Sequence, residues 1–197
     1  MKKNLFILFL IFLIPIKAFA LIEVDITRGN LNPLPLAVSP LSIDDNSKKS
    51  FQNILKKENI GSEISIIVEN NLRTSGLFNP LNKDAFLQAP DIANLKPRFE
   101  DWNLIKAQAL ITGKVKYIDD KLRVEFRLWD VLAAKEMMAL AFTTVPSNWR
   151  RVGHIISDKV YERLTGEKGY FDTRIIYVAE EGPKTQRKKR LAIMDQD

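Results

Sequence analysis

The stretch ALITGKVKYIDDKLRVEFRL, residues 109–128, decides the fold. Apolar and polar side chains alternate along both of its halves, which is the period of a strand with one buried face. Asp119 and Asp120 separate the halves and are typical of the tight turn of a β-hairpin. A third apolar segment, Met137 to Val145, follows after a loop. We therefore expect an antiparallel meander with one apolar face, which a single sheet cannot bury alone.

Two amphipathic segments are expected to cover that face. From Asn148 to Leu164 the apolar residues recur about every 3.6 positions, and Gly166 follows as a stop signal. A second helix is expected from Ser62 to Ser75, with Ser62 as its N-cap and Gly76 as its end. Strands with helices packed on one side predict an α+β domain, built on a mixed or antiparallel sheet and ending near Gly166.

The remaining segments give weaker signals. Asp44 to Ile60 is polar but carries apolar residues at helical spacing, which indicates a surface helix. Pro35 to Pro40 is short and apolar between prolines, so we expect a strand at the edge or start of a sheet. Leu77 to Leu81 is expected to turn the chain. A loose stretch then leads to a short helix around Phe99 to Lys106.

The C-terminal thirty residues indicate the start of a larger structure. Thr173 to Ala179 and Arg190 to Met194 are two expected strands with no helix to pack on. The loop that joins them is basic, with Lys184, Arg187, Lys188, Lys189 and Arg190 in one run. Such a run is most often a solvated loop, and it lacks the interleaved aromatic residues of a nucleic-acid site. We expect no nucleic-acid partner.

The first twenty residues have the pattern of an export signal. Lys2 and Lys3 precede an apolar run from Leu5 to Ile16, which is shorter than the roughly 20 residues that span a bilayer. Ala18 and Ala20 place small residues at the two positions that a signal peptidase reads. We expect cleavage after Ala20, a periplasmic product and no integral membrane segment afterwards. An uncleaved N-terminal anchor is the alternative.

The sequence carries little that could perform chemistry. There is no cysteine, which excludes thiolate catalysis, disulfides and acylation of a lipoprotein cysteine. His154 is the one histidine and lies in an amphipathic segment, where a structural or surface role is expected, with Asp158 sharing its helix face. No Gly-x-Ser-x-Gly elbow or glycine-rich phosphate loop occurs. We expect a protein that binds partners and that has neither enzymatic activity nor a cofactor. Loss of the three lysines of the signal would lower the net charge from +6 to +3.

The segment that follows the signal has two interpretations. Ile22, Val24 and Ile26 alternate with Glu23, Asp25 and Thr27, and Arg28-Gly29-Asn30 ends the pattern. It could be an ordinary first strand of the domain. It could also be a detachable segment that adds to the sheet edge of a partner. The pattern alone favours the first strand.

Several segments, in order along the chain, resemble the TolB family of the Tol-Pal system. The most specific is the run from Tyr161 to Arg174. The others are residues 25–30 with 33–36, 72–73 with 75–78, 97–99 with 101–102, 107–113, 126–131, 148–151 with 154–156, and 190–197.

This resemblance implies an α+β N-terminal domain followed by a six-bladed β-propeller. The family's TolB box matches Leu21 to Asn32, and in the family it binds the C-terminal domain of TolA. The resemblance therefore reverses the preference stated above and makes the segment a partner-binding arm. The implied contact residues are Leu21, Ile22, Glu23, Val24, Asp25, Ile26, Thr27, Arg28, Gly29 and Asn30. The propeller implies a second partner, the lipoprotein Pal, and a role in outer-membrane constriction at division and in envelope integrity.

The expected organisation follows from this resemblance. Residues 1–20 form the signal, 21–33 the arm, 34–168 the α+β domain and 169–197 the first strands of an incomplete propeller. The sequence is therefore expected to be truncated relative to the family. Two rival interpretations are a fragment of an exported propeller-containing peptidase and a generic envelope-binding module that uses the basic loop.

Overall fold

The computed structural model describes residues 32–195, and these form a mixed sheet packed by helices, as predicted. The elements run in the order β1, β2, α2, α3, β3, α4, α5, β4, β5, β6, α6, β7 and β8, with short 3-10 helices η1 and η2. The strand order of the main sheet is β3-β1-β4-β5-β6, with β2 also pairing with β4. The predicted signal and arm lie outside the described residues.

The predicted meander is confirmed. It consists of β4 (Ala109–Ile118), β5 (Lys121–Asp130) and β6 (Lys135–Thr144), which pair antiparallel. Asp119 and Asp120 have φ angles of 50° and 57°, and two left-handed residues form the turn that matches the twist of a hairpin. Buried and half-buried residues alternate along β5, as the sequence pattern predicted.

Three short strands extend the sheet in parallel. β1 (Leu34–Val38) lies between β3 (Phe78–Pro80) and β4, while β2 (Ser42–Ile43) pairs with β4 further along. The prolines at 35 and 40 correctly indicated that a strand starts here. The alternative position at the edge of the sheet was wrong, because β1 lies between β3 and β4. Pro35 has no N–H to donate, yet its carbonyl accepts a hydrogen bond from the N–H of Gln108. The segment at Phe78 was expected to turn the chain, and it is instead the edge strand.

Local capping explains where the helices begin and end. α2 (Asp45–Leu55) follows Asp44, whose carboxylate accepts the N–H of Ser47. α3 (Ile60–Thr74) is capped by Asn59, so the prediction of Ser62 as N-cap was wrong. The backbone N–H of Ser62 donates to the Asn59 side chain at 3.2 Å. Within residues 32–195 we find no helix whose length and apolarity would let it cross a membrane.

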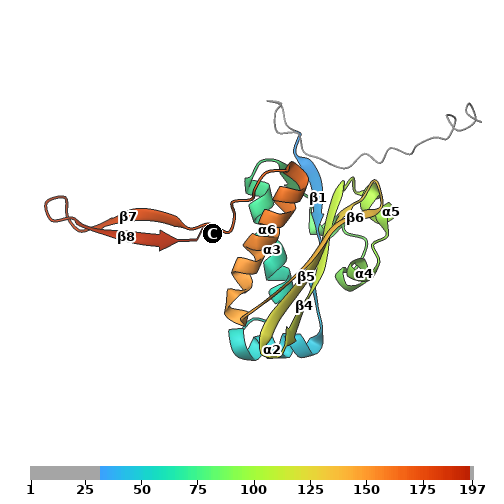
Figure 1. Cartoon of the computed structure of the whole chain (residues 1–197), viewed down its shortest axis with the longest axis horizontal. Coiled ribbons are helices and arrows are strands. Elements are labelled where there is room, and N and C mark those ends of the chain that lie inside the picture. Colours follow the sequence, from blue (N-terminus) through green and yellow to red (C-terminus); the bar gives the residue numbers. More distant parts are fainter. Residues whose placement is uncertain (1–31, 196–197) are drawn as a thin grey trace, which may run out of the picture.

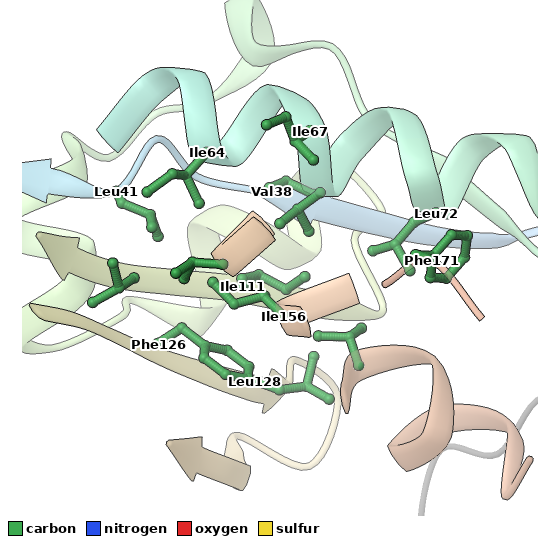
Figure 2. Close-up of a cluster of buried hydrophobic side chains, with 14 of the residues drawn as sticks. Val38, Leu41, Ile64, Ile67, Leu72, Ile111, Phe126, Leu128, Ile156 and Phe171 are labelled. Carbon is green, nitrogen blue, oxygen red and sulfur yellow. The ribbon is translucent and has the colours of Figure 1, made fainter. Parts of the chain in front are cut away.

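α6 (Trp149–Thr165) is the long helix that the sequence predicted. It follows the 3-10 helix η2 (Pro146–Asn148) and ends at Gly166, whose φ of 76° suits glycine. α3 and α6 pack together over one face of the sheet. Figure 2 shows side chains from α3, α6, β1, β4 and β5 meeting in this core, with Phe171 at the same end as Leu72.

The opposite face of the sheet carries a second, smaller core, which the sequence pattern did not predict. α4 (Pro90–Leu95) and α5 (Phe99–Leu104) cover the beginning of β4 there, so the first five residues of β4 are buried on both faces. Trp102 is its largest member, and its indole N–H donates to Gln88 at 3.1 Å. α4 was missed because six residues give too few turns for a period to be visible.

The link between β1 and β2 passes through a narrow space beside the N-terminus of α3. The Ser65 hydroxyl accepts the N–H of Leu41 at 3.0 Å and lies 3.2 Å from the carbonyl of Ser39. Gly61 and Gly113 border this link from α3 and β4. A Cβ atom on Gly61 would lie 2.1 Å from the carbonyl oxygen of Leu41, and one on Gly113 would lie 2.8 Å from the Leu41 side chain.

β7 (Ile175–Glu181) and β8 (Lys188–Met194) form a separate antiparallel hairpin, which projects away from the domain (Figure 1). The predicted pair of strands is confirmed. As expected for strands without a helix to cover them, their apolar side chains are exposed. These side chains are Ile175, Ile176, Tyr177, Val178, Leu191, Ile193 and Met194.

Glu69 predicts a measurable acid sensitivity. Its carboxylate contacts Arg73 of α3 and, at 3.0 Å, Lys83 of the 3-10 helix η1 (Lys83–Ala85). Burial alone would raise the pKa of Glu69, but hydrogen bonds from Lys83 and Arg73 outweigh burial and lower it. A lowered pKa stabilises the fold above the pKa of unfolded glutamate, about 4.3, and this stabilisation is lost as the pH falls through the folded value.

We therefore expect Glu69→Gln to lower the melting temperature at pH 7 but not near pH 3. Thermal melts of both proteins from pH 3 to pH 7 measure the difference. Glu63→Gln is the control, because Glu63 lies on the same helix as Glu69 and forms an ion pair with a single lysine, Lys57, which precedes the helix. A Glu69→Gln effect that is equal at all pH values would contradict the assignment.

Candidate functional site

The residues predicted to bind a partner, Leu21 to Asn30, and the cleavage residues Ala18 and Ala20 lie outside the described residues. The structure instead describes the place where the N-terminal segment joins the domain. There the chain enters β1 at Leu34, whose N–H donates to the carbonyl of Leu77 at 2.9 Å. We therefore build the candidate site from the residues around this entry point.

An aromatic cluster connects the entry point to the C-terminal part of the chain. Leu34 lies opposite Phe78 in the parallel β1–β3 pair. The ring of Phe78 meets that of Tyr161 of α6, edge to face, with centroids 6.2 Å apart. Tyr161 in turn contacts Tyr170 and Phe171, with centroids at 5.6 and 5.8 Å. We call Leu34, Phe78, Tyr161, Tyr170 and Phe171 the junction. It connects the base of the N-terminal segment with residues 166–174, which we call the linker because they join α6 to the hairpin.

The linker is fixed to α6 by Asp158. One carboxylate oxygen accepts the N–H of Phe171 at 2.6 Å and the other accepts the N–H of Asp172 at 3.1 Å. The carboxylate of Asp158 is therefore covered by the linker and does not project freely into solvent. Gly169 lets the linker come this close, since a Cβ atom there would lie 2.4 Å from the Cα of Asp158. The linker is thus part of the domain surface.

A second polar contact continues this attachment. Arg151 lies two turns before Asp158 on α6. Its guanidinium donates to the Asp172 carboxylate, from Nε to Oδ1 at 3.0 Å and from Nη2 to Oδ2 at 3.0 Å. The hydrogen bond and the charge of Asp172 both raise the pKa of Arg151. The pair is exposed, so it orients the linker more than it stabilises the fold.

A polar cleft of about 560 Å³ lies between the first turns of α6 and the base of the hairpin. Arg150, Arg151 and Arg174 line it together with Asp172 and Asp195. Arg174 lies 3.7 Å from Asp195, and Arg151 is held by Asp172. The two aspartates therefore pair with two of the three arginines, while the guanidinium of Arg150 lies over the ring of Trp149. This arrangement suits a polar contact between parts of a protein better than the capture of a free ion.

His154 has the structural role that the sequence predicted. It is 5% exposed and lies between α3 and α6, where its Nδ1 is 2.9 Å from the side-chain nitrogen of Asn71. Asn71 also donates to Ser157 at 3.0 Å. This buried polar group joins the two helices that cover the sheet. Burial between helices makes His154 a poor general base for an external substrate.

The basic loop is partly neutralised by its own hairpin. Glu180 accepts contacts from Arg187 at 2.7 Å and Lys189 at 2.9 Å, and Glu181 lies 3.9 Å from Arg190. Hydrogen bonds from Lys189 and Arg187 lower the pKa of Glu180. The sequence showed the basic run but not its acidic partners, which lie on the opposite strand in register. The charge available to an anionic surface is correspondingly smaller.

Sequence reasoning missed the junction residues as a group. Tyr161 was read as part of a helix, while Tyr170 and Phe171 follow Gly166 in a segment without any period. The sequence did offer one indication of their importance. Tyr161, Tyr170 and Phe171 fall in the run from Tyr161 to Arg174 that most resembles the TolB family. The contacts of Phe171 and Gly169 with α6 are a physical reason for that run to be distinctive.

Comparison with known proteins gives consistent results. The model of the TolB amino-terminal domain matches residues 22–137. The Tol-Pal system protein TolB of Pelagibacter ubique (strain HTCC1062) is 84% identical over 195 residues, which cover 99% of this chain and 43% of that protein. The chain therefore spans less than half of the length of this curated relative.

A solved structure supports the same family. The crystal structure of TolB from Acinetobacter baumannii matches with a TM-score of 0.63 and 25% sequence identity. The match covers 83% of this chain and 36% of that chain. The family model matches more than half of the residues, and the sheet with its helices agrees with the solved fold. This chain belongs to the TolB family of Tol-Pal system proteins.

Proposed function

We propose that this chain is a non-enzymatic periplasmic protein of the Tol-Pal system that binds the C-terminal domain of TolA through Leu21 to Asn30. Family membership supports the system. The alternation of Ile22, Val24 and Ile26 with polar residues supports binding as an added strand. Backbone hydrogen bonds would then supply affinity, and the three apolar side chains would supply contacts with the partner's core.

The proposal divides the chain into functional parts. Residues 1–20 are an export signal cleaved after Ala20, 21–33 the binding arm, 34–168 the α+β domain and 169–197 the first strands of a propeller. In longer family members the propeller would bind Pal, and the two activities together would position Pal during outer-membrane constriction. This role includes cell division and envelope integrity.

The junction is the observation that carries the proposed mechanism. The arm enters the domain beside Phe78, and the linker to the hairpin contacts Tyr161, the residue that packs on Phe78. A partner that moves the hairpin side would therefore act on the base of the arm. The arm would exchange between a state docked on its own protein and a released state that binds TolA, with Pal biasing the exchange.

We expect Val24→Asp to weaken binding to the C-terminal domain of TolA by more than tenfold, because a charge would replace an apolar contact. Calorimetric titration of the chain from Leu21 measures this affinity. Glu23→Gln is the matched control on the polar side of the alternation and should bind nearly as well. A chain that starts at Leu31 should not bind.

Unchanged affinity of Val24→Asp would contradict the arm as the binding element. Equal binding by the chains from Leu21 and Leu31 would place the TolA site in the folded domain. Circular dichroism melts of each variant show whether the domain remains folded.

A further inference from the structure

β6 forms one outer edge of the main sheet. Among residues 32–195 no strand pairs with its outer side, whereas β3 forms the other edge. β3 has three residues and ends at Pro80, which lacks an N–H, so it offers little to an additional strand. β6 has ten residues. A long edge strand presents a row of N–H and C=O groups that another extended segment can pair with.

The two halves of β6 differ in how well they are protected. Lys135 and Glu136 place charges at its start, and the register with β5 shifts at Met137, between Glu136 and Met138. The Met137 carbonyl also accepts a hydrogen bond from Arg163 of α6 at 3.3 Å. Charges and bulges are devices that discourage edge pairing. The second half, residues 138–144, carries no charge and keeps a regular register with β5.

A groove beside this second half could receive side chains. It has a volume of about 220 Å³ and lies between the end of β6 and α6. Phe142, Thr144, Val152 and Ile155 line it, together with Arg151. Phe142 is half-buried, and Leu140 on the same face of the strand is 37% exposed. Apolar side chains of an added strand would extend this partly covered surface.

The opposite face of the sheet next to β6 is charged and has an excess of cations. Arg123, Glu125 and Arg127 of β5 lie opposite Thr143, Ala141 and Ala139. Glu125 is already engaged by Arg123 at 2.9 Å and by Lys114 of β4 at 3.0 Å. Burial would raise its pKa, but those two hydrogen bonds lower it, so it stays ionised. Arg127 pairs with Glu136 at 3.3 Å. Three cations therefore face two acids.

We propose that residues 138–144 of β6 are a second interaction surface, which binds an extended segment of another protein in which apolar residues alternate with acidic ones. The apolar side chains would lie on the groove side with Leu140 and Phe142. The acidic side chains would lie on the other face, beside Arg123 and Arg127. Backbone pairing gives such complexes their affinity, and alternate side chains give them specificity.

The arm of the same molecule has this alternation but is too short to be the occupant. A strand added beyond β6 lies about 19 Å from β1, which is four strand spacings. By the pairing of β1 with β4, β5 and β6, Met138 is level with Val38, so Leu34 lies four residues, or roughly 13 Å, from that level. The direct distance is then roughly 23 Å, but the straight line runs through β4, β5 and β6, so a chain that passes around these strands needs a longer path. The seven steps from Thr27 to Leu34 span at most about 25 Å when fully extended. The occupant therefore comes from another molecule.

Peptide titration tests this surface. The probe is a fluorescent nine-residue peptide that alternates isoleucine with aspartate, and the control peptide has lysine in place of aspartate. We expect the chain from Leu21 to bind the acidic probe at least tenfold more tightly than the lysine peptide. Ala141→Glu should weaken binding of the acidic probe at least tenfold. Asn46→Glu adds the same charge on exposed α2 and should leave binding unchanged.

Two proline variants test backbone pairing. Neighbouring residues of an edge strand direct their N–H groups alternately to the sheet and to solvent. One of the two variants Leu140→Pro and Ala141→Pro therefore removes an N–H that points to solvent. That variant should keep the wild-type melting temperature but no longer bind the probe. Undiminished binding by that variant and by Ala141→Glu would overturn the proposal, as would no binding of the acidic probe. Self-association that needs both residues 21–30 and the β6 edge would identify a second copy as the occupant and overturn the partner assignment.

Discussion

Phe171→Ala is expected to lower the free energy of unfolding by about 3–5 kcal/mol, the usual cost of removing a buried phenylalanine. Phe171 is 1% exposed although it follows the last helix of the domain. Its ring contacts Tyr161, and its N–H is bonded to Asp158. Loss of the ring would leave a cavity between α6 and the end of the core near Leu72 (Figure 2).

Chemical denaturation followed by tryptophan fluorescence measures this cost. Tyr170→Ala is the matched control, because Tyr170 is the neighbouring aromatic residue but is 44% exposed, and it should cost clearly less. Limited proteolysis gives a second result, since a loosened linker should be cut between Gly166 and Arg174. A cost below about 1 kcal/mol for Phe171→Ala would contradict the junction as part of the core.

The sequence predicted the parts of the fold that have a clear period. The meander was predictable because ten-residue strands show alternation and because Asp119-Asp120 suit a two-residue turn. α6 was predictable from its five apolar positions and its terminal glycine. β3 and α4 were missed, since three and six residues are too short to show a period. The central place of β1 depends on pairing with distant residues, which no local pattern reveals.

The site was less predictable than the fold for a physical reason. Asp158 looks like any exposed acid of an amphipathic helix until the linker is placed over it. In the same way, the acidic partners of the basic loop become visible only when the register of β7 and β8 is known. The arm was proposed from resemblance to the TolB family, because its alternation alone favours an ordinary first strand.

Gly61→Ala is expected to destabilise the protein by about 3 kcal/mol, at the upper end of the cost of overpacking. This result would be opposite to the usual gain when alanine replaces glycine in a helix, which is about 1 kcal/mol. The added Cβ atom would lie 2.1 Å from the carbonyl oxygen of Leu41, so either α3 or the β1–β2 link must move. The link has little freedom, because Ser65 holds the N–H of Leu41.

Ser62→Ala separates this steric effect from helix propensity, because Ser62 is the next residue of α3, is half-buried and has no cap role for its side chain. It should change the free energy of unfolding by less than about 1 kcal/mol. If Gly61→Ala instead stabilised the protein, the close approach of α3 to Leu41 would be wrong. Since Leu41 also packs against Gly113 of β4, that outcome would displace the helix from the central strand. The mutation thus tests how the helical layer is held on the sheet.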